Sequence, residues 1–310
     1  MKKSIWLIVV LVFGYGYVQA QRVGASPEYI RALTSQWKGE RFPDGRPKVP
    51  DAMLERLKDV GMEEAWQVLQ NRGFKNQYQG GWMVLKPDSV MTGRVVTAQY
   101  MPFRPDFAQV IKEEGVAENR DTSGGTNSWP IDILKNGDVY VADGYDKIAG
   151  GTLIGDNLGN AIYTNSHRGV IFYGSVRDAP GLKEIPGFNA WIRGQDPSYI
   201  DQMMLTSINM PIRIGRTVVL PGDVVLANQY GTVFIPAYLV HDVVLTAEIT
   251  ALRDEFGHQR LREKKYLPGQ IDSQWSDEIK KDFENWLSHY PGKLPMTKQE
   301  LNDYLKERNY

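Results

Sequence analysis

An aspartate and an Arg-Asp pair bracket a stretch of the sequence that could form one charged site. The stretch reads GDNLGNAIYTNSHRGVIFYGSVRD and runs from Gly155 to Asp178, with Asp156 near its start and Arg177 near its end. A guanidinium can bind a carboxylate through two parallel hydrogen bonds. A carboxylate offers the hard oxygens that Mg²⁺ and Mn²⁺ prefer. These residue types therefore suit the binding of an anionic ligand beside a divalent cation.

The elements expected around this stretch bring its two ends together. Residues 138–142 and 170–173 have the composition of strands, and residues 156–167 carry apolar side chains at helical spacing. The start of such a helix exposes unpaired backbone N–H groups that attract a carboxylate or a phosphate. The Arg-Asp pair follows a strand, at the edge where open α/β sheets bind ligands. The pattern predicts one pocket between the helix start and the strand end.

Both features also have purely structural interpretations. Asp156 could serve only as the N-cap of the helix. Arg177 and Asp178 could form a surface pair in a turn, which would contribute little to stability. The spacing by itself does not separate these interpretations from the functional one.

Other residue types with catalytic potential form no recognised constellation in this sequence. Cysteine is absent, which excludes thiol catalysis and Cys-ligated zinc, and the four histidines are not paired at the spacing of metal ligands. Ser166 and His167 are adjacent, and adjacent residues on a helix do not face each other. The Gly-rich runs at residues 123–127 and 149–157 fit neither the Walker nor the Rossmann spacing.

Residues 1–20 have the features of a secretory signal peptide. Lys2 and Lys3 form a basic start, an apolar run follows, and Val18-Gln19-Ala20 offers the small or permissive residues that signal peptidase reads. We therefore expect cleavage before Gln21 and export to the periplasm or the medium. An uncleaved anchor helix is the alternative, although the apolar run is short for a membrane span.

The overall composition excludes several classes of protein. The chain has 36 Lys and Arg against 37 Asp and Glu residues, and without Lys2 and Lys3 its net charge is −3. This balance gives no electrostatic footprint for a nucleic acid, and no later stretch is apolar enough to span a bilayer. An exported chain without cysteine depends on its own core, which a chain of this length can bury.

The pattern of elements changes twice along the chain. Between residues 82 and 236 short β-branched runs alternate with Gly, Asp and Pro turns, and beyond Ala237 the chain is helical and rich in charge. Helices are expected at residues 27–37, at 51–73 in two parts separated at Gly61, and in three segments after Ala237. We expect an N-terminal arm (21–48), an α/β domain (49–254) and a C-terminal helical extension (255–310).

The stretch from Asp156 to Asp178 resembles the signature of the RraA-like family, which includes the divalent-metal-dependent 4-hydroxy-4-methyl-2-oxoglutarate aldolases. Those enzymes carry an Asp, twenty intervening residues and then Arg-Asp, and here twenty residues separate Asp156 from Arg177. Three further segments resemble the family in the same order: VPDAMLERLKDVG, MTGRVVTAQYMP and PIRIGRTVVLPGDVVLANQYGTVFIP. The resemblance covers about 190 of the 310 residues.

The resemblance implies an RraA-like swivelling β/β/α domain with a central β-sheet and outer helices. It also implies a homotrimer or hexamer with the active site at a subunit interface. By comparison with the family, Asp178 would hold the metal largely through water, and Arg177 and Asp156 would be catalytic. The backbone N–H groups that would grip a 2-oxo acid substrate, together with Arg177, are those near Gly155, Asp156, Asn157 and Leu158.

The implied reaction is a retro-aldol cleavage that releases pyruvate. The charge that develops on the pyruvate enolate would be stabilised by Mg²⁺ or Mn²⁺ as an electron sink and by the fixed positive charge of Arg177. Oxaloacetate decarboxylation would use the same enolate, so we expect it as a side activity. The alternative function is a non-catalytic binding or regulatory protein, as the RNase-regulating members of the family are; export would separate it from a cytoplasmic RNase.

The sequence departs from the family in two places near the expected site. Asn228 and Tyr230 stand where many relatives carry acidic residues. The acidic residue that a neighbouring subunit contributes in some of these aldolases is not placed by the sequence. Its candidates, each of which also fits a solvated helix face, are Glu248, Asp254, Glu255 and Glu263.

Overall fold

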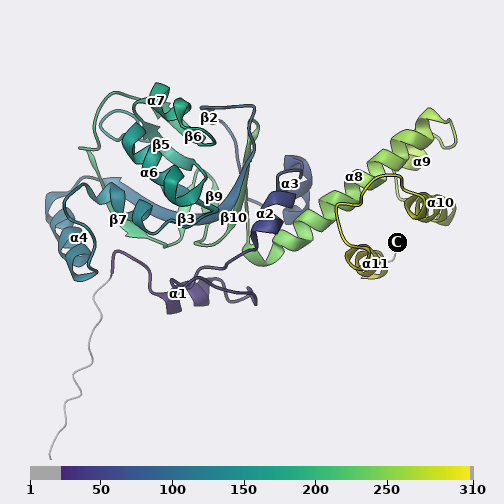
Figure 1. The fold of residues 1–310 in the computed structure, drawn as a ribbon, viewed down its shortest axis with the longest axis horizontal. Coiled ribbons are helices and arrows are strands. Elements are labelled where there is room, and N and C mark those ends of the chain that lie inside the picture. Colours follow the sequence, from purple (N-terminus) through teal and green to yellow (C-terminus); the bar gives the residue numbers. More distant parts are fainter. Residues whose placement is uncertain (1–21, 308–310) are drawn as a thin grey trace, which may run out of the picture.

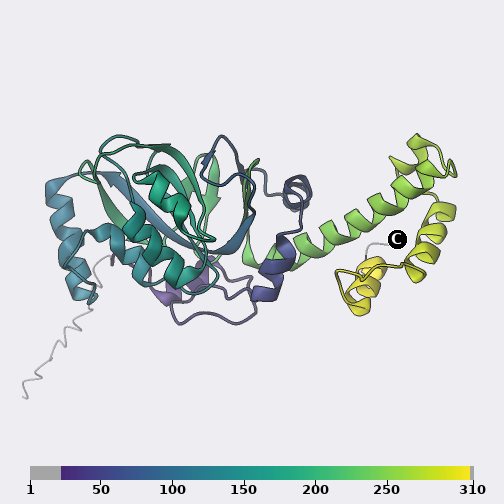
Figure 2. The same cartoon turned by 45° about the horizontal axis from the view of Figure 1, so that its top comes forward.

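The computed structural model describes residues 22–307 of the chain. One long helix projects from an α/β body and carries a small helical unit at its far end (Figures 1 and 2). The expected signal peptide and the cleavage point before Gln21 lie outside the described residues. Between residues 22 and 307, no helix combines the length and apolar character needed to cross a membrane.

A nine-stranded mixed sheet forms the centre of the body, in the order β1-β11-β10-β3-β4-β5-β6-β2, and β7 also pairs with β3. Its strands are β1 (Tyr78–Gln79), β2 (Met83–Val84), β3 (Met91–Pro102), β4 (Asp138–Asp143), β5 (Val170–Val176), β6 (Ala190–Gln195), β7 (Met203–Ile208), β10 (Val224–Asn228) and β11 (Gly231–Ile235). The four strands β3 to β6 are parallel, whereas the outer pairs are antiparallel. A separate hairpin consists of β8 (Ile212–Ile214) and β9 (Thr217–Val219).

Helices connect the parallel strands, because a parallel pair cannot be joined by a tight turn. These crossover helices are α4 (Pro105–Ala117), α5 (Trp129–Asp132), α6 (Asp156–Ser166) and α7 (Ala179–Glu184). Those outside the parallel part are α1 (Pro27–Leu33), α2 (Asp51–Leu57), α3 (Met62–Asn71), α8 (Val240–Arg262), α9 (Pro268–Ile271), α10 (Asp277–Ser288) and α11 (Lys298–Glu307). The short 3₁₀ helices are η1 (Thr126–Ser128) and η2 (Ala237–Leu239). The expected α/β fold with a central sheet, outer helices and a C-terminal helical region is confirmed.

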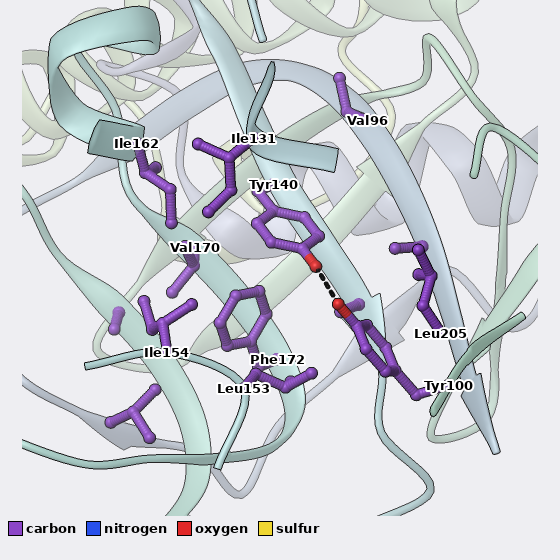
Figure 3. Packing of buried hydrophobic residues seen from close by; sticks show 14 of the residues in the cluster. Val96, Tyr100, Ile131, Tyr140, Leu153, Ile154, Ile162, Val170, Phe172 and Leu205 are labelled. Atoms are coloured by element: carbon purple, nitrogen blue, oxygen red, sulfur yellow. Dashed lines mark hydrogen bonds between the residues drawn. The ribbon is translucent and has the colours of Figure 1, made fainter. Parts of the chain in front are cut away.

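The two faces of the sheet bury different cores. On the face covered by α5, α6 and α7, the hydroxyl groups of Tyr100 and Tyr140 lie 2.7 Å apart and satisfy each other (Figure 3). The ring of Tyr140 packs edge-on against Phe172, with centroids 4.8 Å apart. On the other face, Trp191 is fully buried in a cluster that includes side chains of β8 and β9. Each parallel strand is therefore covered on both sides, which explains its near-continuous apolar sequence.

The N-terminal arm packs onto the body and is tied to it by a buried ion pair. Val23 and Ile30 are buried, and the side chain of Arg46 is fully enclosed. The guanidinium of Arg46 lies 3.0 Å from the carboxylate of Asp138 and 2.7 Å from that of Asp44. Since a buried charge without its partner is costly, this contact fixes the arm against the start of β4.

The long helix α8 belongs to two cores in succession. Its first turns pack with α2 and α3 against β10 and β11. Its second half packs with α9, α10 and α11 around Phe256, Trp275 and Phe283. Glu248, one of the candidates for an acid offered to a neighbouring subunit, is almost fully buried on α8 and pairs with Arg56 of the same chain at 2.6 Å. Its interpretation as part of a solvated helix face is therefore wrong.

Some elements differ from the sequence-based expectation. α1 ends at Leu33, whereas the pattern predicted a helix to residue 37. The pattern also did not predict α4, which buries only Ile111 and Gly115, or α7, which has six residues. Both helices show too little apolar periodicity to be recognised locally.

Candidate functional site

The segment that leads into α6 runs alongside the end of β5. The N–H of Leu153 donates to the carbonyl of Ser175 at 2.9 Å, and the N–H of Arg177 donates to the carbonyl of Ile154 at 3.0 Å. These strand-like bonds place the start of α6 directly beside the residues that follow β5. The two ends of the stretch from Gly155 to Asp178 therefore meet, as the sequence predicted.

Gly155 is the point of contact between the two ends. A Cβ atom at this position would collide with Oδ2 of Asp178 and would lie 3.3 Å from Cζ of Arg177. The backbone of Gly155 has φ −114°, which any residue can adopt. The glycine is therefore required by the closeness of Asp178 and Arg177, and not by the backbone conformation.

Arg177 and Asp178 form an accessible charged pair. Nη1 of Arg177 lies 3.2 Å from Oδ2 of Asp178, and the two side chains are 38% and 41% exposed. Asp178 has φ 54°, in the left-handed region, where the chain turns from β5 into α7. This turn directs the pair to the surface at the carboxyl ends of the parallel strands, where a ligand can reach it.

The first turn of α6 completes one side of the site with backbone donors. Oδ1 of Asp156 accepts the N–H of Asn157 at 2.9 Å, and the other oxygen of the carboxylate packs against Gly181 of α7. Within residues 22–307, the N–H groups of Asp156 and Leu158 have no acceptor that belongs to the helix. The positive end of the helix dipole adds to their attraction for an anion. The side chain of Leu158 packs against the core, so only the backbone N–H of this residue is available to bind an anion.

Tyr199 is a further member of the site that the sequence did not indicate. Its ring lies under the guanidinium of Arg177 at 5.2 Å and is 71% exposed. The loop that carries it is held by Ser198, whose hydroxyl accepts the N–H of Gly150 at 2.6 Å and whose carbonyl accepts the hydroxyl of Thr152. Hydrogen bonds from Ser198 also hold the pKa of Asp196 below its usual value. In the sequence, the only signal for Tyr199 was an aromatic residue within a polar loop.

The donor set of the site suits one kind of metal ion. Asp178 offers a half-exposed carboxylate, and within the described residues its Oδ1 has no hydrogen-bond partner. The part of the chain from residue 22 to 307 contains no group of three or more His, Asp or Glu side chains that could enclose a metal. Mg²⁺ keeps several waters and is commonly held by one or two carboxylates together with its substrate. A single carboxylate at an open site fits that ion, and does not fit a tetrahedral zinc.

Asn228 and Tyr230, at the turn between β10 and β11, make their hydrogen bonds to residues outside the cluster around Arg177 and Asp178. The carbonyl of Asn228 accepts the indole N–H of Trp191 at 2.8 Å, and its side chain accepts the N–H of Tyr230. Tyr230 is 65% exposed. Within the described part of the chain, no hydrogen bond or ion pair joins either residue to Arg177 or Asp178.

Comparison with known proteins identifies the family and supports the fold. The model of the RraA-like family, described as Aldolase/RraA, matches residues 47–234, which is more than half of the chain. A protein of Stutzerimonas stutzeri (strain A1501), named "Putative 4-hydroxy-4-methyl-2-oxoglutarate aldolase", is 28% identical over 156 residues, which are 46% of this chain and 94% of that protein.

Two solved structures share the fold. RraAS2 of Streptomyces coelicolor, described as an unusual member of the RNase ES inhibitor RraA protein family, is 25% identical with a TM-score of 0.59, over 69% of this chain and 100% of that chain. An uncharacterized protein of Pseudomonas syringae pv. tomato is 18% identical with a TM-score of 0.58, over 76% of this chain and 99% of that chain. At that identity the second structure supports the fold alone.

Proposed function

Because the chain belongs to the RraA-like family, we propose that it is a divalent-metal-dependent lyase that cleaves a 4-hydroxy-2-oxo acid and releases pyruvate. The observation that carries this proposal is the contact of Arg177 and Asp178 with Gly155 at the start of α6. A cation, an acid and the backbone donors of the first turn of α6 therefore lie next to one another at the surface. The name of the Stutzerimonas relative supports the same class of reaction.

Each residue of the cluster has a distinct role in this proposal. Asp178 holds Mg²⁺ or Mn²⁺, which supplies an electron sink for the charge that develops on the 2-oxo acid. Arg177 binds the substrate carboxylate and stabilises the nascent enolate with fixed positive charge. The N–H groups from Gly155 to Leu158 grip the 2-oxo acid. Asp156 accepts the N–H of Asn157 and so holds the first turn of α6, whose backbone donors face the same substrate as Arg177.

The test is pyruvate release by the purified protein, assayed with Mg²⁺ or Mn²⁺ on a panel of 4-hydroxy-2-oxo acids and on oxaloacetate. Arg177→Ala should lower turnover by about 100-fold or more if the residue acts on developing charge. Arg177→Lys should not restore it, because the planar fork is lost. Asp178→Ala should weaken the apparent affinity for the metal by about 10-fold or more.

A matched control is the exposed pair Arg104 and Asp106, whose side chains are 73% and 66% exposed. Arg104→Ala and Asp106→Ala remove the same chemical groups from a pair whose side chains, within the described residues, bond only to each other and to the N–H of Phe107, and they should leave turnover unchanged. Wild-type activity in all three variants of Arg177 and Asp178 would contradict the proposed site. Absence of pyruvate release by the wild type, with either metal and every substrate, would contradict the lyase.

The second candidate function is a non-catalytic regulatory protein. It is favoured by the likeness to RraAS2, which covers the whole of that chain. A protein that folds, lacks pyruvate release and binds a protein partner through the same surface would support it. The presence of both Arg177 and Asp178 favours the lyase.

Export forms part of the same proposal. The basic start and the apolar run before Val18-Gln19-Ala20 support cleavage before Gln21. N-terminal sequencing of the protein from its native host should then begin at Gln21. A mature protein that begins at Met1 would contradict export by cleavage.

A further inference from the structure

The N-terminal arm and the body line a small, mostly apolar pocket that shares no residue with the proposed active site. Its volume is about 200 Å³, and its walls include Leu33 and Trp37 from the end of α1, Phe74 after α3, and Pro236 and Tyr238 around η2. Aromatic and aliphatic surfaces of this kind bind the apolar body of a small ligand. The volume is suitable for a single aromatic ring with a short chain.

One acidic residue, Asp223, lines this apolar pocket. It lies in the turn before β10 and is only 4% exposed. Its Oδ2 accepts the N–H of Leu220 at 2.8 Å. Within residues 22–307, its Oδ1 has no hydrogen-bond partner, although it is not among the fully enclosed unpaired atoms. This oxygen therefore keeps some solvent exposure, and a donor from a ligand in the pocket would take the place of water on it.

The cations near the pocket walls in sequence already bond to oxygen atoms of the chain: Nζ of Lys38 donates to the carbonyl of Ser35 and Nζ of Lys75 to that of Gln70, each at 2.9 Å. The guanidinium of Arg41 donates to the carbonyls of Thr34 and Trp37 at 2.8 and 3.1 Å, and to the hydroxyl of Thr34 at 2.7 Å. These bonds hold the end of α1 that forms one wall. They direct the positive charge of Arg41 to backbone oxygens, and Arg41 is not one of the residues that line the pocket.

We propose that this pocket is a binding site for a small apolar amine, with its ammonium group on Asp223 and its apolar body between Trp37, Phe74 and Tyr238. The ammonium donates a hydrogen bond to the carboxylate and provides the positive charge that pairs with it. The aromatic side chains of the walls also attract a cation. A divalent ion held by one carboxylate keeps a shell of several waters, and walls that are mostly apolar, with only Thr34, Ser35 and Gln36 as further polar side chains, are poorly suited to that shell. An organic anion would be repelled by the ionised carboxylate.

Burial also makes Asp223 responsive to such a ligand. Burial raises the pKa of Asp223 to about 7, and the bond from Leu220 lowers it only in part. An ammonium favours the ionised form of a carboxyl group. The amine should therefore bind most tightly above about pH 7, where the carboxyl group of Asp223 is already ionised, and more weakly at lower pH, where a proton competes with it.

The probe for the test is phenethylamine, and its neutral isostere 2-phenylethanol is the reference ligand. Both are titrated into the full-length mature protein by calorimetry at pH 8, where most of the carboxyl group is ionised. We expect the amine to bind the wild type about tenfold or more tightly than the alcohol, since a charge-assisted hydrogen bond replaces a neutral one. The indole N–H signal of Trp37, assigned with a Trp37→Phe variant, should shift on binding.

Three variants locate the effect. Asp223→Asn keeps the shape and should remove the preference for the amine, so that both ligands bind alike. Asp59→Asn, an exposed acid outside the pocket, should keep the preference. Tyr238→Ala lies at the exposed rim, where folding is not at risk, and should weaken both ligands equally.

The proposal is overturned if the amine binds no more tightly than the alcohol, or if neither binds at up to about 10 mM, a range that covers weak millimolar affinity. It is also overturned if Asp223→Asn still prefers the amine. The same holds if Tyr238→Ala binds both ligands as tightly as the wild type and the indole N–H signal of Trp37 does not shift on binding. Thermal unfolding of each variant verifies that it is folded. Pyruvate release is not used, so the outcome is independent of the proposed lyase activity.

Discussion

At the scale of single residues, the candidate site has little to do with stability. Arg177 and Asp178 are both more than one-third exposed, and pairs of this kind contribute about 0–1 kcal/mol. Gly155 is likewise not required by its backbone angles. Substitutions here can therefore change function while the free energy of unfolding stays nearly constant, which makes the residues suitable for testing.

Gly155→Ala should reduce pyruvate release without unfolding the protein. The added Cβ collides with Oδ2 of Asp178, the end of a side chain that can move away. Displacement of a metal-binding carboxylate by about 1 Å can cost about 100-fold in rate. Gly124→Ala is the matched control, because a Cβ there meets nothing within 4 Å. Equal turnover in both variants would show that the closeness of Gly155 to Asp178 is irrelevant to activity.

At the scale of elements, α8 is attached to the body by a charged contact as well as by its core. Both Nε and Nη2 of Arg56 on α2 donate to the carboxylate of Glu248, at 2.8 and 2.6 Å, and Nη1 donates to Glu300 on α11 at 3.0 Å. Glu248 is 9% exposed. A bidentate pair in this position is stronger than an exposed one, and it joins α2, α8 and α11.

Arg56→Ala and Glu248→Ala should each destabilise the protein by about 1–3 kcal/mol, because the remaining partner loses its hydrogen bonds in a mostly buried place. The double variant should cost less than the sum, with a coupling of about 1 kcal/mol or more in a double-mutant cycle. Chemical denaturation gives these values. The exposed pair Arg104 and Asp106 provides the control cycle, with an expected coupling of under about 1 kcal/mol.

The turn before β10 should make stability depend on pH. Burial raises the pKa of Asp223 from 3.8 to about 7 in the folded protein, so the folded state binds more protons than the unfolded state between these values. Its contribution to stability is therefore greatest below about pH 4 and is lost as the pH rises to 7, by a few kcal/mol at most. Asp223→Asn should remove this slope, measured as the difference in denaturation free energy between variant and wild type.

The contribution of Asp282 has the opposite sign and a different window, so the two can be separated. Burial opposes it, but hydrogen bonds from Arg260 and Lys265 lower the pKa of Asp282 to about 2. Stability from this carboxylate is present above its ordinary pKa of 3.8 and is lost as the pH falls towards 2. For Asp223, the pH dependence would be wrongly assigned if the difference in unfolding free energy between wild type and Asp223→Asn did not change from pH 4 to pH 7.

At the scale of the whole molecule, the long α8 and the helices at its end enlarge the surface far beyond the α/β body (Figure 2). They form a core of their own, in which Phe256 lies 5.3 Å from both Trp275 and Phe283 between ring centroids. The proposed active site lies on the body, and the pocket beside Asp223 lies between the body and the arm. The two proposed sites and the C-terminal helices thus lie on different parts of the molecule.

The protein should be a homotrimer or a multiple of three in solution. This expectation rests on the family and on the exposure of Arg177 and Asp178, which leaves the proposed site accessible to a second copy of the chain. Multi-angle light scattering at micromolar concentration should give three or six times the chain mass. A monomer that retains full pyruvate release at the same concentration would contradict both the assembly and a site built between subunits.

The sequence by itself determined the elements that carry the site. Local periodicity and turn residues predicted β4 and α6 to within one residue, because these patterns depend on neighbours within one helix turn or one strand pleat. For β5 they predicted only residues 170–173, whereas the strand continues to Val176. The spacing of twenty residues between Asp156 and Arg177 and the ordered similar segments indicated the family. Local patterns did not reveal α4 and α7, since each buries only two residues.

Only the tertiary structure decided how distant segments meet. The bonds between the residues before α6 and the end of β5 bring Gly155 against Asp178, and the loop anchored by Ser198 brings Tyr199 under Arg177. The pairing of Glu248 with Arg56 and the enclosure of Asp223 by the arm also join residues far apart in sequence. Such contacts depend on strand order and packing, which are set by the burial of the whole chain, and no local pattern encodes them.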